Sequence, residues 1–274
     1  MRATVDGLVL RSVDTGESDK LLTVLTAEHG KIIVMAKGAR SMRSRLSPLC
    51  HIFSYGNMEL YQKNGMRWLS GGSVNSSFVG LHSDVEGYAL AAYLIEIADQ
   101  ISGEGVAAQE LLRMLLNALY LIEQKKRPRE LIRGVFQVFA SSYSGFMPDL
   151  DACAVCGAER ADRFYLDVMN GSVRCPTCFS GGGARTLAQS EEMANAVQVI
   201  LPITETARAA WHYIESAPLP RRFAFDITEW EELEAFAQGG ATYLQHHLEH
   251  GFEALAFYEV VKETPHKAEQ KERI

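Results

Sequence analysis

The sequence lacks any long hydrophobic run, since nowhere in its 274 residues do 18 apolar residues follow one another. A helix that crosses a membrane needs about 20 such residues. The first segment, MRATVDGLVL, also lacks the pattern of a secretory signal, because Asp6 interrupts the apolar stretch that such a signal requires. We therefore expect a cytoplasmic protein without membrane segments.

The motifs of the common enzyme classes are missing as well. The sequence contains no Walker phosphate-binding loop, no G-x-S-x-G nucleophile elbow and no H-E-x-x-H metalloprotease motif. Each of these motifs places a nucleophile, a base or a phosphate cradle where a reaction needs it. Without them, we expect a protein that is not an enzyme.

Acidic residues are scarce in the N-terminal part although the whole chain is acidic. The chain carries 27 Lys and Arg against 34 Asp and Glu, a net charge of −7. Residues 1–80 hold 10 basic and 6 acidic side chains, so this part is +4 and the remainder is −11. A basic module on an acidic body is typical of a protein that binds a polyanion with one of its parts.

The stretch from Lys31 to Met58 contains no acidic residue at all, and it includes the basic segment KGARSMRSRL. The basic side chains of this segment are Lys37, Arg40, Arg43 and Arg45. The segment follows one strand-like run and precedes another, so we expect a loop that could bind nucleic-acid phosphates. A solvated loop that pairs with acidic groups of the same chain is the alternative, and charge alone fits both interpretations.

Strand-like runs fill the first 75 residues, without a helix-length pattern among them. They are short apolar or alternating segments, and Asn64-Gly65 between the last two is the dipeptide favoured by a type I′ turn. Five strands in a segment of this size predict a small barrel of the OB type. Its aromatic residues, which could stack on bases or fill the core, are Phe53, Tyr55, Tyr61 and Trp68.

Helical periodicity replaces this pattern after Asn75. Two capping-box sequences, Ser83–Glu86 and Thr228–Glu231, predict helix starts, and Pro128 suits a first helical turn. The middle and the C-terminal part therefore read as a helical bundle. Helices are expected after Ser83, over 107–124, from Pro128, over 191–201, after Thr204, and from Thr228 to about His250.

Cysteine is rare, with five residues, but four of them form two C-x-x-C pairs separated by 18 residues. The pairs are Cys153/Cys156 and Cys175/Cys178. This spacing is typical of structural zinc sites, in which each pair lies in a tight turn and supplies two thiolates to a tetrahedral Zn²⁺ ion. Four thiolates leave no coordination position for water, so catalysis at the metal is not expected.

Two other interpretations of the cysteines are weaker. Disulfides are rare in a reducing cytoplasm and would leave Cys50 over, and a thioredoxin-like motif needs a βαβ pattern that neither pair has. The segment between the pairs, FYLDVMNGSVRC, predicts a hairpin that turns at Asn170-Gly171. Cys50 is expected to be a buried apolar residue.

Two segments of the sequence together resemble one known family. GLVLRSVDTGESDKLLTVLTAEHGKIIVMAKGARSMRSRL resembles the N-terminal segment of the RecO family of bacterial recombination mediators. GFMPDLDACAVCG followed by CPTC is similar to the zinc segment of that family. The resemblance follows the chain in order, from an OB-like segment through a helical middle to the four-cysteine insertion.

The resemblance implies binding to single- and double-stranded DNA and annealing of complementary strands. It also implies a complex with RecR that helps to load RecA onto strands coated by the single-stranded-DNA-binding protein, SSB, and hence a place at the nucleoid. The acidic C-terminal tail of SSB would dock on the helical domain, on residues that the resemblance does not assign. The arginine-rich turn at Arg221 and Arg222 has the charge to bind such a tail, although a solvated connection between helices is the default interpretation. The family's basic loop corresponds here to Lys37, Arg40, Arg43 and Arg45, and its zinc ligands to Cys153, Cys156, Cys175 and Cys178.

We thus expect an α+β protein of several domains. A five-stranded OB-fold barrel (1–80) would bind DNA, and an all-α domain (81–148 and 187–262) would carry a zinc-binding insertion (149–186) and a charged tail (263–274). The expected function is that of a non-enzymatic recombination mediator in DNA repair of the RecF-pathway type. The alternatives are a nucleic-acid-processing enzyme with a zinc ribbon, which needs a catalytic constellation, and a transcription regulator, which binds a specific sequence.

Overall fold

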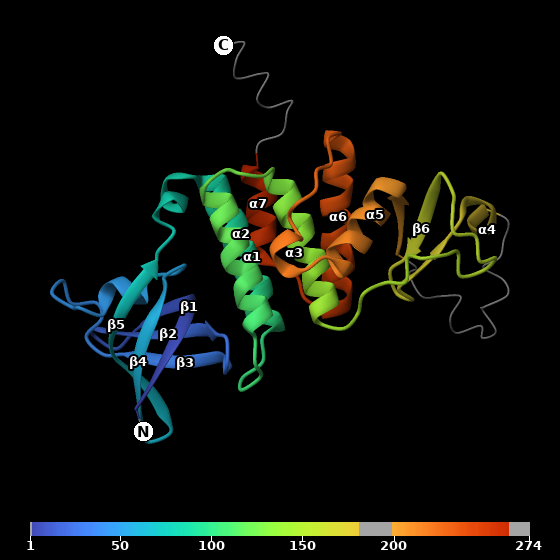
Figure 1. The fold of residues 1–274 in the computed structure, drawn as a ribbon. Helices are drawn as coiled ribbons and strands as arrows, with labels where there is room; N and C mark the ends of the chain where they lie inside the picture. Colours follow the sequence, from blue (N-terminus) through green and yellow to red (C-terminus); the bar gives the residue numbers. More distant parts are fainter. Residues whose placement is uncertain (1, 181–198, 263–274) are drawn as a thin grey trace, which may run out of the picture. The chain divides into compact units, whose positions relative to one another are not determined.

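The computed structural model describes residues 2–180 and 199–262 (Figure 1). The chain divides into two compact units, one formed by the residues up to Lys126 together with those from Phe252 onward, and the other by Arg127–Gly251. The charged tail expected at 263–274 lies outside the described residues. Among the described residues, none of the helices combines the length and the hydrophobicity that a membrane span requires.

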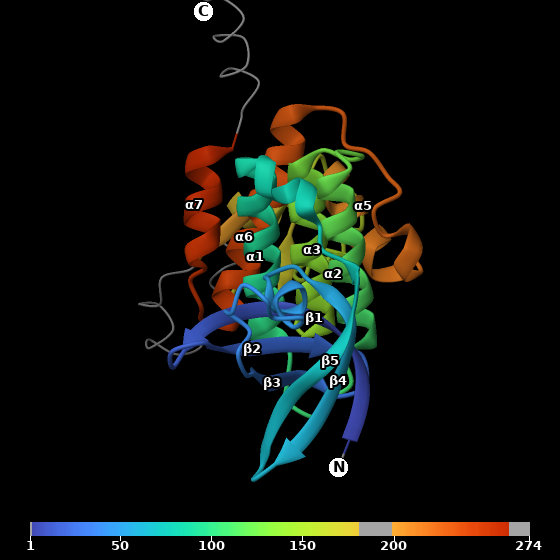
Figure 2. The ribbon, with the colours of Figure 1, turned by 90° about the vertical axis from the view of Figure 1, so that its left-hand side faces the viewer.

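The first unit begins with a closed five-stranded barrel, which confirms the predicted OB-type architecture. Its strands follow one another in the order β1-β2-β3-β5-β4, and β3 and β5 are the parallel pair. In Figure 2 the β4–β5 hairpin extends beyond the other strands. The strands are β1 (Arg2–Thr15), β2 (Asp19–Thr26), β3 (Gly30–Ala36), β4 (Tyr55–Lys63) and β5 (Met66–Ser76).

The alternation of apolar residues along these strands fills the barrel. Val9, Val24 and Val34 are completely buried in its core, and a 3-10 turn, η1 (Ser47–Cys50), adds Cys50. Burial also raises the pKa of the Cys50 thiol to about 11, so this residue is a protonated core residue, as predicted. Asn64 and Gly65 both have positive φ, 51° and 78°, as a type I′ turn requires.

In the described part of the first unit the barrel is joined by the helices α1 (Val85–Ile101), α2 (Gln109–Glu123) and α7 (Glu253–Val261), which packs on α1. The predicted N-cap of α1, Ser83, was wrong. Ser83 belongs to a 3-10 turn, η2 (Val79–Ser83), and its hydroxyl donates to the Gly80 carbonyl. The next residue, Asp84, has the extended backbone of an N-cap and its carboxylate accepts from the Gly87 amide at 3.0 Å.

The second unit is built on the packing of α3 (Arg129–Tyr143) against α6 (Trp230–Leu248). Gly134 makes this approach possible, because a Cβ atom there would lie 2.3 Å from the Phe236 ring. The capping box predicted at Thr228 was wrong, since the N-cap of α6 is Glu229 and makes no side-chain capping bond. Among its described residues, this unit also contains α4 (Pro176–Ser180), α5 (Glu205–Ser216) and the 3-10 turn η5 (Leu219–Arg221).

A small sheet of three strands carries the cysteine segment. The predicted hairpin is present as β6 (Arg163–Asp167) and β7 (Ser172–Arg174), although four residues, not two, form its turn. A third strand, β8 (Ile200–Thr204), pairs antiparallel with β6. The helix predicted over 191–201 is therefore wrong at Ile200 and Leu201, and its residues 191–198 lie outside the described part of the chain.

Candidate nucleic-acid interface and metal centre

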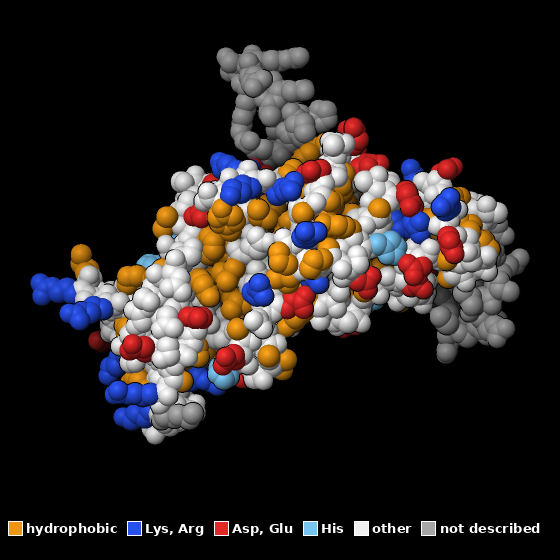
Figure 3. Space-filling view, viewed as in Figure 1, with side chains coloured by type: hydrophobic (Ala, Val, Ile, Leu, Met, Phe, Trp, Pro, Cys, Tyr) orange, Lys and Arg blue, Asp and Glu red, His pale blue; other side chains and the backbone are white. Residues whose placement is uncertain are grey.

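The basic segment forms an exposed loop between β3 and β4, as predicted. Lys and Arg side chains gather on the barrel at the left of Figure 3, including a protrusion that also carries hydrophobic atoms. The same segment protrudes from the barrel in Figure 1. The four predicted residues, Lys37, Arg40, Arg43 and Arg45, are all exposed.

Hydrogen bonds to the neighbouring β1–β2 turn fix the start of this loop. The amide of Gly38, whose φ is 66°, donates to Asp19 Oδ1 at 2.7 Å. The Arg40 amide donates to the Ser18 carbonyl at 2.9 Å, and Ala39 between them is completely buried. The loop therefore has a defined shape before it meets any ligand, which lowers the entropy cost of binding.

Arg40 differs from the other three basic residues, because it has an acidic partner. Its Nε lies 3.1 Å from Asp14 Oδ2 on β1, and its Nη1 donates to the Glu17 carbonyl at 3.2 Å. The stretch around the loop contains no acidic residue in sequence, but folding brings Asp14 next to it. Within the part of the chain that the structure describes, Lys37, Arg43 and Arg45 have no ion-pair partner. These three side chains are available to phosphates.

The aromatic residues of the barrel separate into two groups. Phe53 is completely buried and packs edge-to-face on Tyr88, so it cannot contact a base. Tyr61 and Trp68 are the chain neighbours of the inward-facing Leu60 and Leu69, and alternation therefore turns them to the outer face of β4 and β5. Their rings stack there with centroids 6.3 Å apart, and Tyr61 is 36% exposed. This pair is a surface on which a base can stack.

The four predicted metal-ligating cysteines come together at one end of the small sheet. Their Sγ atoms, from Cys153, Cys156, Cys175 and Cys178, all lie within 4.8 Å of one another. None of them forms a disulfide, and the Sγ atoms of Cys156 and Cys175 are 3.7 Å apart. The first pair lies in a tight turn, in which Gly157 has a φ of 72° and donates to the Cys153 carbonyl.

The electrostatics of the cluster favour a cation. Although burial raises the pKa of the Cys153 thiol, hydrogen bonds from the backbone amides of Cys175, Cys156 and Val155 outweigh it and lower the pKa to about 6. Hydrogen bonds with the neighbouring thiols of Cys156 and Cys175 raise the pKa of Cys178 to about 12. Four thiolates this close repel one another, and a bound metal ion removes that repulsion.

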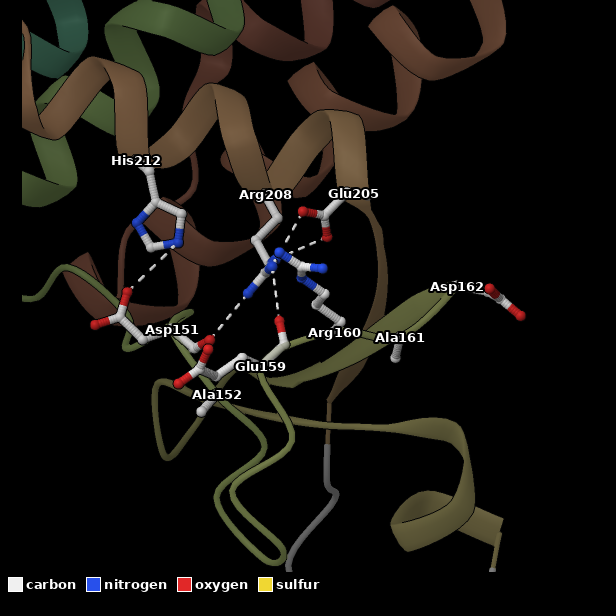
Figure 4. Close-up of a pocket in the computed structure, with 9 residues that line it drawn as sticks. All are labelled: Asp151, Ala152, Glu159, Arg160, Ala161, Asp162, Glu205, Arg208 and His212. Carbon is white, nitrogen blue, oxygen red and sulfur yellow. Dashed lines mark hydrogen bonds and ion pairs between the residues drawn. The ribbon is translucent and has the colours of Figure 1, made fainter.

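Arg208 on α5 holds the segment that carries the first cysteine pair (Figure 4). Its guanidinium donates to the carbonyls of Leu150 and Asp151, both at 3.0 Å, and of Glu159 at 2.9 Å. It also pairs with Glu205 and lies over the Phe164 ring, 4.8 Å from the centroid. Sequence reasoning missed this residue, because its only local signal is the i, i+3 spacing from Glu205.

Arg208 is one of the residues, drawn in Figure 4, that line a hollow with a volume of about 930 Å³. Its walls carry acidic and basic side chains together, among them Asp162, Arg160 and His212. The charge of Arg208 is used by its internal partners and is not directed at a ligand. We therefore interpret the hollow as a structural feature around the contacts that hold the cysteine segment, and not as a ligand site.

Of the arginines proposed for a peptide site, Arg222 and Arg221 have different environments. The Arg222 guanidinium lies over the Phe139 ring, 5.1 Å from its centroid, and Nε donates to the Ala217 carbonyl. The side chain of Arg221 is exposed at the end of η5, where its carbonyl accepts from the Tyr213 hydroxyl. The turn therefore combines an exposed cation with a cation that is stacked on an aromatic ring.

Comparison with known proteins covers nearly the whole chain. Residues 1–78 match the family model described as "Recombination protein O N terminal", and residues 82–256 match "Recombination protein O C terminal". The chain is 33% identical over 265 residues to the DNA repair protein RecO of Anaeromyxobacter dehalogenans, covering 95% of this chain and 97% of that protein.

Two further relatives have the same description. The DNA repair protein RecO of Acetivibrio thermocellus is 27% identical over 252 residues, which are 92% of this chain and 94% of that protein. That of Bacillus subtilis is 32% identical over 179 residues, or 65% of this chain and 69% of that protein.

Proposed function

Because the chain belongs to the recombination protein O family of DNA repair proteins, we propose that it is a non-enzymatic recombination mediator acting at the nucleoid. It binds single- and double-stranded DNA and anneals complementary strands. Together with RecR, it helps to load RecA onto DNA coated with SSB. The observation that carries this proposal is the preformed basic loop with three cations that lack an acidic partner among the described residues.

The proposed DNA contacts start at that loop. Lys37, Arg43 and Arg45 neutralise phosphates, and each contact gains free energy from the counterions that it releases. The stacked rings of Tyr61 and Trp68 on the barrel surface offer a platform for bases of a single strand. These contacts read no sequence, as expected of a protein that handles any broken strand.

Annealing of complementary strands needs no catalytic residue. Two complementary strands repel each other through their phosphates, and a protein that screens this charge raises the rate at which the strands meet. Tight contact with phosphates and loose contact with bases leaves the base edges free to pair. The chain's own contribution is therefore a set of positioned charges.

For the metal centre we propose a structural Zn²⁺ ion held by the four cysteines. A tetrahedral ion with Zn–S bonds of about 2.3 Å places its sulfur ligands about 3.8 Å apart. The 3.7 Å between the Sγ atoms of Cys156 and Cys175 fits this geometry. Four thiolates fill every position of the ion, so its role is to hold the segment together, with Arg208 as a second brace.

The turn around Arg221 is the proposed contact for the acidic C-terminal tail of SSB. An exposed guanidinium offers a charge-assisted hydrogen bond to a carboxylate. Charge reversal, Arg221→Glu, tests this contact without removing the stacked Arg222. We expect weaker binding of a labelled tail peptide, and unchanged affinity would remove the assignment.

The proposed function is tested by mixing complementary oligonucleotides that carry a donor and an acceptor fluorophore. We expect the protein to accelerate annealing relative to the free strands, and the acceleration to decline as salt rises. The double variant Arg43→Glu/Arg45→Glu is expected to lose most of the acceleration. An annealing rate equal to that of the free strands would contradict the proposal.

A further inference from the structure

Met42, at the tip of the basic loop, has an unusually exposed side chain. Its relative exposure is 103%, whereas the next most exposed large hydrophobic side chain among the described residues, Val260 on α7, reaches 73%. Scattered apolar residues are ordinary on protein surfaces. Complete exposure of a long apolar side chain at the end of a protruding loop is a stronger indication of a binding contact.

The backbone of the loop holds Met42 in this position. The Ser41 amide donates to the Gly38 carbonyl at 3.1 Å, and the Ser44 amide donates to the Ser41 carbonyl at 2.9 Å. Met42 and Arg43 are therefore the two central residues of a tight turn, whose base is fixed to the barrel through Gly38. These bonds hold the Met42 backbone in the exposed turn.

Positive charge surrounds the exposed methionine along the chain. Arg40 and Arg43 lie within two residues of it and Arg45 lies three residues on, while no acidic residue occurs from Lys31 to Met58. Met42 lies between Arg40 and Arg43, so when Arg43 and Arg45 reach phosphates, its side chain at the tip is placed next to the sugar and the bases. A thioether is flexible and makes favourable contacts with aromatic rings.

We infer that Met42 is an apolar wedge that inserts between two bases of the DNA held by the loop. This inference rests on the proposed function, because the loop must first bind phosphates. Proteins that insert Met, Leu, Ile or Phe between base steps do so beside basic side chains, and the insertion unstacks the step. Unstacking is easiest where the stack is already interrupted. The substrate class that this site selects is therefore DNA with a weakened step, such as a nick or a mismatch.

The experiment uses the full chain and two duplexes of the same sequence, one intact and one nicked, with 2-aminopurine next to the nick position. The wild type is expected to bind the nicked duplex more tightly and to increase its 2-aminopurine fluorescence. In Met42→Ala we expect the preference for the nicked duplex to fall by about tenfold, as for the loss of one buried apolar side chain. The fluorescence increase is lost as well, while the salt dependence stays that of the wild type.

Two matched variants complete the test. Met42→Leu keeps an apolar wedge and should retain both the preference for the nicked duplex and the fluorescence increase. Val260→Ala removes an exposed apolar side chain on α7 and should change neither quantity. If Met42→Ala keeps the wild-type preference and fluorescence while binding stays salt-dependent, the wedge is refuted and the proposed function stands. If the wild type shows no salt-dependent binding to either duplex, both are refuted.

Discussion

Asp14 on β1 and Arg40 in the β3–β4 loop form an ion pair, with 3.1 Å between Asp14 Oδ2 and Arg40 Nε. Both side chains are about half exposed, so the pair contributes little to the stability of the fold. The same carboxylate also pairs with Lys20 at 3.2 Å. Asp14 therefore partly neutralises the positive charge that would otherwise face a bound phosphate.

Replacing this carboxylate is expected to strengthen DNA binding. Asp14→Asn leaves Arg40 and Lys20 without their anion, so we expect affinity for a single strand to rise by about two- to fivefold at low salt. The free energy of unfolding should change by less than about 1 kcal/mol. Fluorescence anisotropy and urea denaturation measure the two quantities, and weaker binding by Asp14→Asn would show that the pair positions the loop for DNA.

Removal of the proposed zinc ion is expected to destabilise the second unit but not the barrel. Metal analysis of the purified protein should give about one zinc ion per chain. Chelation should lower the thermal midpoint by about 5–10 °C, because folding and metal binding are coupled. The affinity for a single DNA strand should stay unchanged, because the proposed DNA contacts lie on the barrel.

Cysteine variants give the matched control for this prediction. Cys175→Ser should lose the metal, whereas Cys50→Ala, in the barrel core, should retain it. Full metal content in Cys175→Ser would contradict the assignment of the four ligands.

Arg208 is predicted to brace the cysteine segment. Arg208→Ala removes the donors to three buried or partly buried carbonyls, which should lower the free energy of unfolding by about 2–4 kcal/mol. It should also speed the release of metal to a coloured chelator. Arg160→Ala, which lines the same hollow with an exposed side chain, is the control and should affect neither.

The close approach of α3 and α6 gives a prediction about packing. Gly134→Ala places a Cβ atom 2.3 Å from the Phe236 ring and should destabilise the protein by about 1–3 kcal/mol in urea denaturation. Gly239→Ala, on α6, meets no atom within 4 Å. It should stabilise the protein by up to about 1 kcal/mol through helix propensity. Equal effects of the two variants would contradict this packing.

Local patterns in the sequence were sufficient for the barrel and for the cysteine cluster. The five strand-like runs and the Asn64-Gly65 turn predicted the barrel, and the two C-x-x-C pairs predicted the cluster from their spacing. In both cases the signal lies within a few residues of the chain. The loop was likewise predicted from its position between two strand-like runs, and its basic residues lie close together in the sequence.

Features that depend on tertiary contacts were not predictable in this way. Asp14 and Arg40 are far apart in sequence and meet only because the β1–β2 turn lies against the loop. Arg208 reaches carbonyls about 50 residues away, and no periodicity marks such a contact. Ile200 and Leu201 pair with β6, which overrides the helical pattern of the preceding residues.

Fluorescence anisotropy of a labelled single strand across a salt series shows whether the basic loop binds phosphates. Arg43→Glu/Arg45→Glu is compared with the wild type and with Arg160→Glu/Arg163→Glu, which changes the charge equally near the cysteine segment. We predict that the loop variant binds more weakly at low salt and that its slope of log K against log salt is less steep by about 1.4, as for two lost phosphate contacts. Superimposable curves for the wild type and the loop variant would show that the loop does not bind phosphates.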